Sequence, residues 1–210
     1  MHALATPLIT KPDGTKYGKT EGEAVWLSPE RMSPYAFYQF WINRADAEVP
    51  GLLRVFTFRS REEIEELERE TAEHPAARTG QRVLAEDLTT LVHGAEEYTR
   101  AVAASQALFG QGDLGALDAR TLAAALAEVP SVTVKAGDAL PPVADLMAAT
   151  GIAPSKSEAR RAIAQGGAYL NNVKVTEQDA VPQASDLLHG RFLVLRRGKR
   201  TVGGAEVRTG

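Results

Sequence analysis

Apolar residues recur at helical spacing between about residues 33 and 128. Residues 33–34, Ser-Pro, predict an N-cap followed by proline at the first helical position, ahead of an aromatic-rich run that ends near Ile42. Ser60 and Glu63 have the spacing of a capping box and predict the start of a second helix with a mostly acidic outer face. The same periodicity predicts three further helices, over 83–92, 95–109 and 118–128.

The pattern changes after residue 129. Residues 130–138 are interpreted as a linker with a possible strand, and two short helices follow. Residues 169–175 are typical of a tight hairpin, because Asn171 and Asn172 tolerate positive φ, and 191–195 alternates as a later strand. The two short helices are predicted over 142–149 and 155–165. This part is predicted to be a small α+β unit.

The first 28 residues contain too few apolar positions to fold alone. They predict a strand over 4–10, a turn at 12–14 and a cationic loop at 16–20. The whole chain is therefore predicted to be α+β and mainly helical. The expected divisions are a front segment 1–30, an all-helical bundle 33–128, a linker 129–138, a small α+β domain 139–202 and a C-terminal tail 203–210.

Composition narrows the classes of protein. With 210 residues, 44% hydrophobic and 24% charged, the chain is ordinary globular protein. It has no cysteine and four histidines without paired spacing, so we expect no disulfide, no zinc site and no other metal site. The N-terminus has no basic region or apolar stretch like those of a signal peptide, and no apolar run approaches ~20 residues. We expect a soluble, cytoplasmic protein without a membrane segment.

Charge is divided unevenly along the chain. Residues 1–149 hold 14 Lys and Arg against 22 Asp and Glu, a net charge of −8, whereas residues 150–210 hold 10 against 5, a net charge of +5. A basic C-terminal part suits binding to a phosphate backbone, since each cation that neutralises a phosphate releases a counterion. The alternative is an ordinary solvated charged surface.

The cationic loop Lys16-Tyr17-Gly18-Lys19-Thr20 has two interpretations. It nearly matches the phosphate loop of P-loop nucleotidases, but the first glycine is one position too late and an aspartate would face the phosphates. Alternatively, two lysines three residues apart close over a triphosphate and neutralise the charge on departing pyrophosphate. In this form the loop resembles the lysine signature of class I aminoacyl-tRNA synthetases, although Tyr17, Gly18 and Thr20 differ from the commonest residues of that signature.

Longer strings extend this likeness. The run 33–43, the Phe-Thr-Phe at 56–58 and the Leu-Val-His-Gly at 91–94 resemble bacterial tyrosyl-tRNA synthetases in order and spacing. The resemblance covers about residues 3–200, and the part from 142 onward is similar to the S-four-type RNA-binding module. It implies a helical domain for the anticodon arm followed by that module. In this sequence Asp46 is a candidate to contact an anticodon base, whereas Phe37, Tyr38, Phe40 and Trp41 are expected to be core.

The resemblance implies a two-step reaction with ATP as co-substrate, accompanied by Mg²⁺, in which tyrosine is joined to tRNA(Tyr) through tyrosyl-adenylate. It implies catalytic roles for Lys16, Lys19 and Thr20, and contacts from Lys16, Gly18 and Lys19 to the ATP phosphates. The Rossmann-like domain that precedes this loop in the family is absent from the sequence. We therefore expect that the chain alone does not activate tyrosine, and that the intact family enzyme is a homodimer whereas this fragment is monomeric.

RNA binding is the activity expected of the chain itself. A helix N-terminus and clustered cations on the S-four-type module favour contacts with the backbone of a structured RNA. The candidate residues are Ser155, Lys156, Ser157, Arg160, Arg161, Asn171, Lys174, Arg196, Arg197 and Lys199, with Arg200 beside them. The alternative function is a non-enzymatic RNA-binding protein with a vestigial nucleotide loop.

Overall fold

The computed structural model describes residues 3, 24–135 and 140–208, and these divide into two compact units. The first unit ends at Tyr98 and the second begins at Thr99. The predicted strand 4–10, the turn 12–14 and the cationic loop lie outside the described residues. The first unit contains α1 (Pro34–Ile42), α2 (Val49–Phe56), α3 (Arg61–Glu73), the short η1 (Pro75–Ala77) and α4 (Thr79–His93), and α5 (Ala95–Leu108) spans the division.

Helix starts in the first unit follow the predicted caps. Ser33 Oγ accepts from Ala36 N at α1, and Ser60 and Glu63 form a reciprocal capping box at α3. Helix α2 was not predicted, because its Pro50 and Gly51 are usually read as turn residues. Proline is accepted there since it occupies the first turn, where its missing N–H costs nothing.

Helices α1 and α4 form the centre of the first unit. Their pairing is antiparallel, because Phe37 near the start of α1 meets the ring of His93 at the end of α4, with ring centroids 4.9 Å apart. At the other end Arg78, which precedes α4, donates to Ile42 O. The predicted core aromatics Phe37, Tyr38 and Trp41 are buried, which confirms their expected role, and Phe40 is half-buried.

The second unit is built on a mixed sheet of five strands among the described residues. The strand order is β1-β5-β4-β2-β3, with β1 parallel to β5 and the other pairs antiparallel. The bounds are η2 (Leu114–Ala116), α6 (Ala119–Ala127), β1 (Ser131–Lys135), α7 (Val143–Ala149), α8 (Lys156–Ala164), β2 (Ala168–Leu170), β3 (Val173–Lys174), η3 (Ala184–Asp186), β4 (Phe192–Arg197) and β5 (Thr201–Arg208). The predicted α+β fold is confirmed, including the hairpin, whose Asn171 and Asn172 have φ of 48° and 68°.

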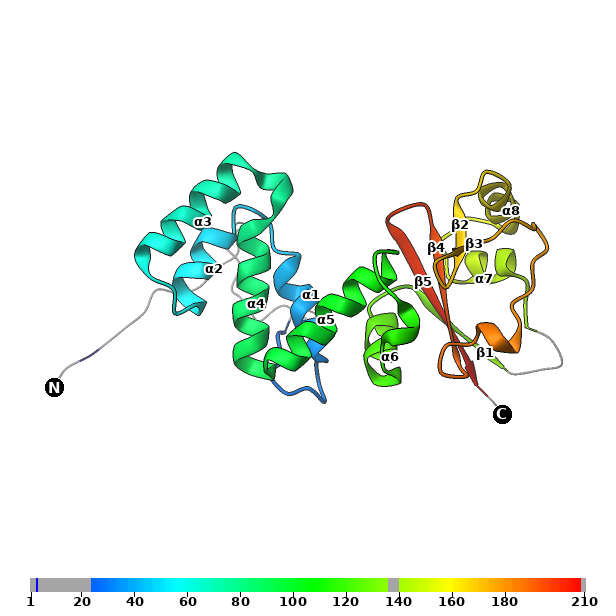
Figure 1. Cartoon of the computed structure of the whole chain (residues 1–210), viewed down its shortest axis with the longest axis horizontal. Coiled ribbons are helices and arrows are strands. Elements are labelled where there is room, and N and C mark those ends of the chain that lie inside the picture. The colour runs from blue at the N-terminus through cyan, green and yellow to red at the C-terminus, as the bar shows by residue number, and fades with distance from the viewer. Residues whose placement is uncertain (1–2, 4–23, 136–139, 209–210) are drawn as a thin grey trace. The chain divides into compact units, whose positions relative to one another are not determined.

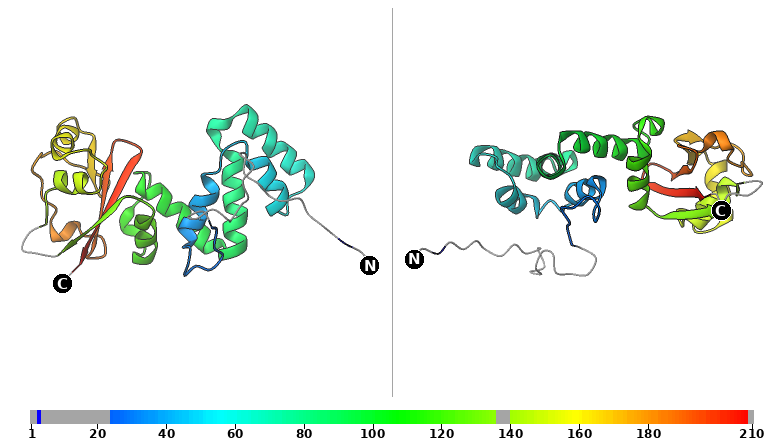
Figure 2. Two further views of the ribbon diagram at one scale, coloured as in Figure 1. Left: turned by 180° about the vertical axis from the view of Figure 1, so that it is seen from behind. Right: turned by 90° about the horizontal axis from the view of Figure 1, so that it is seen from below.

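The sheet separates two layers of helices (Figures 1 and 2). On one face α7 and α8 pack against Leu193, Leu195 and Ala205 in a continuous apolar core. On the other face α6 approaches β5, where the side chain of Leu126 lies close to Gly204. The strands thus present alternate residues to different helices, as the period-2 pleat requires.

One part of the sheet corrects the sequence interpretation. Residues 203–208, expected in a C-terminal tail, belong to β5. The possible strand in the expected linker is present as β1, residues 131–135, which pairs with β5. Gly203 and Gly204 made β5 difficult to predict from the sequence, because glycine is unfavourable in strands unless another group approaches the backbone closely. That is the case here: a β-carbon on Gly203 would lie 2.8 Å from Ile152 Cγ2, and one on Gly204 would lie 2.6 Å from Ser131 Oγ.

Candidate nucleic-acid interface

Helix α8 begins after an N-cap formed by Ser155. Ser155 Oγ accepts a hydrogen bond from Glu158 N at 3.2 Å, and Lys156 and Ser157 in the first turn of α8 are exposed. The carboxylate of Glu158 also pairs with Arg161 at 2.8 Å. The helix start is therefore well defined and carries exposed polar groups.

Each cation predicted on α8 has an acidic partner. Lys156 Nζ lies 2.7 Å from Asp145 of α7, Arg160 lies 3.2 Å from Asp179, and Arg161 pairs with Glu158. All three cationic side chains are exposed, so these are surface pairs of small net energy that a phosphate can replace. The α8 surface is nevertheless close to neutral before any ligand arrives.

The turns beside β4 hold cations without acidic partners among the described residues. Lys199 and Arg200 are exposed at the β4–β5 turn, and Lys174 is exposed on β3. Lys174 lies against the end of α8, since a β-carbon on Gly166 would be 2.4 Å from its Nζ. Lys174, Lys199 and Arg200 are therefore exposed cations for which the described residues provide no acidic partner.

The sheet register sorts the predicted residues between two faces. Lys174 is paired with Tyr169, and Tyr169 with Arg196, so these three side chains form one row across β3, β2 and β4. Arg197 has the opposite orientation and donates to Ile152 O at 3.3 Å on the side of α7 and α8. The predicted residues therefore do not form one continuous patch.

Two predicted residues are engaged inside the protein. Asn171 donates from Nδ2 to Asp186 O at 2.6 Å, and its Oδ1 accepts from Val194 N at 2.9 Å. Arg196 is 9% exposed, and its guanidinium lies 4.0 Å from the centre of the Tyr169 ring. Tyr169 and Asn172, which contact this arginine, were not among the predicted binding residues. The alternation of Tyr169 with buried Ala168 was the available signal in the sequence.

A second group of charges lies at the end of β5. Glu206 accepts from Arg191 and from Arg208, the latter at 2.8 Å, and the neighbouring Arg208 guanidinium holds the pKa of Glu206 below its usual value. These residues line a cavity of about 530 Å³ together with His189. His189 itself is a turn residue with φ of 50°, and its Nε2 lies 2.7 Å from Leu117 O.

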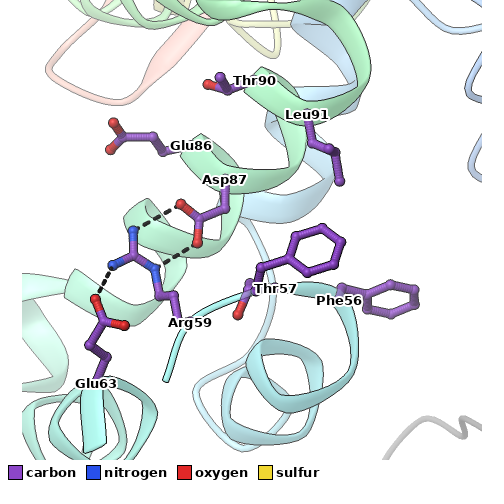
Figure 3. Close-up of a pocket in the computed structure, with 9 residues that line it drawn as sticks. Phe56, Thr57, Arg59, Glu63, Glu86, Asp87, Thr90 and Leu91 are labelled. Carbon is purple, nitrogen blue, oxygen red and sulfur yellow. Dashed lines mark hydrogen bonds and ion pairs between the residues drawn. The ribbon is translucent and has the colours of Figure 1, made fainter. Parts of the chain in front are cut away.

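The first unit contains an open pocket of about 510 Å³ between α3, α4 and the end of α2 (Figure 3). Arg59 donates to both carboxylate oxygens of Asp87, at 2.6 and 2.8 Å, and pairs with Glu63 at 3.5 Å. The bidentate bond to Asp87 raises the pKa of Arg59. Phe58 also lines the pocket and is 93% exposed. Of the polar groups shown in Figure 3, Arg59, Asp87 and Glu63 are thus paired with one another.

Asp46 lies in the turn between α1 and α2 with an exposed carboxylate. Buried Gln81 of α4 donates to Asp46 Oδ1 and to Arg44 O. A role for Asp46 in contacting a base stays a prediction.

The four predicted nucleotide-contacting residues Lys16, Gly18, Lys19 and Thr20 lie outside the described residues. Within residues 24–135 and 140–208 no group of three acidic or histidine side chains could hold a metal ion. Over the same ranges no helix combines the length and apolarity needed to cross a bilayer.

Comparisons with known proteins give matches over nearly the whole chain. The family described as tRNA synthetases class I (W and Y) matches residues 1–110, and the tyrosine–tRNA ligase SYY-like C-terminal domain matches residues 121–202. The tyrosine–tRNA ligase of Thermobifida fusca is 62% identical over 208 residues, which are 99% of this chain and 48% of that protein. The tyrosine–tRNA ligase of Streptomyces avermitilis is 60% identical over 210 residues, 100% of this chain and 49% of that protein.

A solution structure of a tyrosyl-tRNA synthetase C-terminal domain is 34% identical and covers 46% of this chain and 96% of that one, with a TM-score of 0.38. The chain spans about half the length of the curated relatives it matches, and the matched half is their C-terminal portion.

Proposed function

Since the chain belongs to the class I tRNA synthetases (W and Y), we propose that it is the C-terminal part of a tyrosine–tRNA ligase and that by itself it binds tRNA(Tyr). The observation that carries the proposal is the order of the two matches, a class I synthetase segment followed by a tyrosine–tRNA ligase C-terminal domain. The relatives are ligases, which disfavours the alternative of a non-enzymatic RNA-binding protein.

The second unit carries the proposed RNA contacts. The exposed cations at the β4–β5 turn and on β3 supply charge without acidic partners among the described residues. The start of α8 supplies backbone N–H groups that have no partner within the helix. Backbone amides, hydroxyls and cations of this kind bind phosphate and ribose rather than reading bases, as suits a structured RNA. The proposed contacts are Ser155, Lys156, Ser157, Arg160, Arg161, Lys174, Arg197, Lys199 and Arg200.

The nucleotide chemistry belongs to the longer enzyme. In the longer enzyme Lys16, Gly18 and Lys19 would contact the β- and γ-phosphates of ATP, and Thr20 would donate a hydrogen bond. Mg²⁺ would bind together with the ATP. Interactions made only in the transition state accelerate the reaction, so these lysines act as pyrophosphate forms. We also propose that the longer enzyme is a cytoplasmic homodimer and that this chain is monomeric.

Two measurements on the purified chain test the proposal. Tyrosine-dependent ATP–pyrophosphate exchange should be absent, because the chain spans about half the length of its relatives and its sequence does not contain the Rossmann-like domain that the resemblance implies for the longer enzyme. Binding of tRNA(Tyr) should be measurable and should weaken as salt rises. Failure to bind tRNA(Tyr) at low salt would refute the binding proposal, and exchange activity would refute the assignment of catalysis to the longer enzyme.

A further inference from the structure

We infer that Arg196 is a positioning residue that fastens together the two turns carrying the free cations, and that it does not itself bind phosphate. This inference rests on the proposed RNA binding of the second unit. It concerns the hairpin turn at Asn171–Asn172 and the β4–β5 turn at 198–200. The sequence predicted Arg196 to contact RNA, whereas its surroundings in the structure support a positioning role.

The guanidinium of Arg196 contacts other protein groups through its face and through its nitrogen atoms. Its plane lies 4.0 Å from the Tyr169 ring centre, Nη1 donates to Gly198 O at 2.6 Å, and Nε donates to Asn172 Oδ1 at 3.3 Å. The Nη2 group lies against Gly110, where a β-carbon would be 2.9 Å away. With 9% of the residue exposed, a phosphate would reach Arg196 only after these contacts had been given up.

The hairpin turn is fixed from its other side as well. Asn172 Nδ2 donates to Ala107 O in the last turn of α5 at 2.7 Å, while its Oδ1 accepts from Arg196. Asn171 is held by Asp186 O and Val194 N. Side-chain bonds therefore hold both residues of a turn whose φ angles are positive.

These contacts determine where the free cations lie. Lys174 follows the hairpin turn directly on β3, and Lys199 follows Gly198, the residue whose carbonyl accepts from Arg196. A planar guanidinium can stack on a ring and donate in two directions together, whereas a lysine ammonium cannot reproduce that geometry. Arg196 thus sets the spacing between Lys174 and Lys199 before RNA arrives.

The test compares Arg196→Lys, which keeps the charge, with Asn172→Gly, which removes no charge and suits the positive φ. Each variant should weaken tRNA(Tyr) binding by about tenfold, because each breaks the connection between the turns. In RNA-free protein the ¹⁵N–¹H resonances of Asn172 and Lys199 should both move in Arg196→Lys. The control Lys199→Ala should lower the salt slope of binding by about one and leave the Asn172 resonance in place.

A direct phosphate role makes the opposite predictions. Arg196→Lys would then bind within about twofold of the parent chain, Asn172→Gly would have no effect, and the RNA-free resonances would stay fixed. Any of these results overturns the inference. If the parent chain fails to bind tRNA(Tyr), the proposed function fails, but the resonances of the free protein still decide whether Arg196 connects the turns.

Discussion

Removing the two cations of the β4–β5 turn is the sharpest test of the RNA binding proposed for the second unit. In the double variant Lys199→Ala with Arg200→Ala, two exposed side chains without acidic partners in the described part of the chain lose their charge. The turn lies outside the apolar core, so the fold should be retained. Binding to tRNA(Tyr) should weaken, and its dependence on salt should become flatter.

The magnitude follows from counterion release. Each phosphate contact contributes about 0.7 to 0.9 to the slope of log K against log salt, so two contacts contribute about 1.4 to 1.8. Over a fourfold rise in salt, from about 50 to 200 mM, this slope corresponds to about 7- to 12-fold in affinity. The difference between the parent chain and the variant should therefore shrink by about tenfold across that range.

Two further variants rank the contributions. Arg160→Ala with Arg161→Ala should have a smaller effect at low salt, because each of these cations must give up its ion pair, with Asp179 or Glu158, before it can bind a phosphate. Arg61→Ala with Arg69→Ala removes the same charge from α3 in the first unit, where Glu65 and Glu66 are the partners. This control should leave the slope unchanged.

Binding of tRNA(Tyr) would be followed by fluorescence anisotropy or filter retention at four or more salt concentrations. An equal loss of slope in the turn variant and in the α3 control would mean that only net charge matters, and the assignment of the RNA surface to the turn would be refuted. A larger loss in the α8 variant than in the turn variant would refute the ranking.

Two stability predictions follow from individual residues. Gly204→Ala should lower the free energy of unfolding by about 1–3 kcal/mol, since the added methyl overlaps Ser131 and Leu126. Gly51→Ala should raise it by about 0.5–1 kcal/mol, because the added methyl has no atom within 4 Å and alanine favours the helix. Denaturant unfolding measures both free energies, and an equal response of the two variants would contradict the packing argument. Burial lowers the pKa of His93, so the unfolded chain binds the proton more readily, and stability should be full above the unfolded pKa of about 6.5 and decline as pH falls below it. Thermal unfolding at several pH values should show a weaker decline in His93→Gln, and an identical decline would exclude this histidine as its source.

Local signals predicted the helices well because their causes are local. The caps at Ser33, Ser60 and Ser155 each accept a backbone N–H a few residues ahead, and that geometry depends only on neighbouring residues. The hairpin at Asn171–Asn172 was predictable for the same reason. Periodic apolar positions likewise placed the buried aromatics of α1 correctly.

Features that depend on distant contacts were not predictable. The strand character of residues 203–208 comes from pairing with β1 and β4, and its glycines have meaning only beside Ile152 and Ser131. The burial of Arg196 depends on Tyr169 and on Gly110, which is far away in sequence. A string of cations therefore indicates binding to polyanions in general, but tertiary packing decides which cations are accessible.

The position of β5 has a consequence for biosynthesis. Among the described strands β5 comes last in the sequence, yet it lies between β1 and β4. While the ribosome still holds residues 201–208, β1 has no partner among the other described strands and exposes its unpaired backbone groups. The nascent second unit is therefore open to aggregation or to chaperone binding until β5 has left the ribosome.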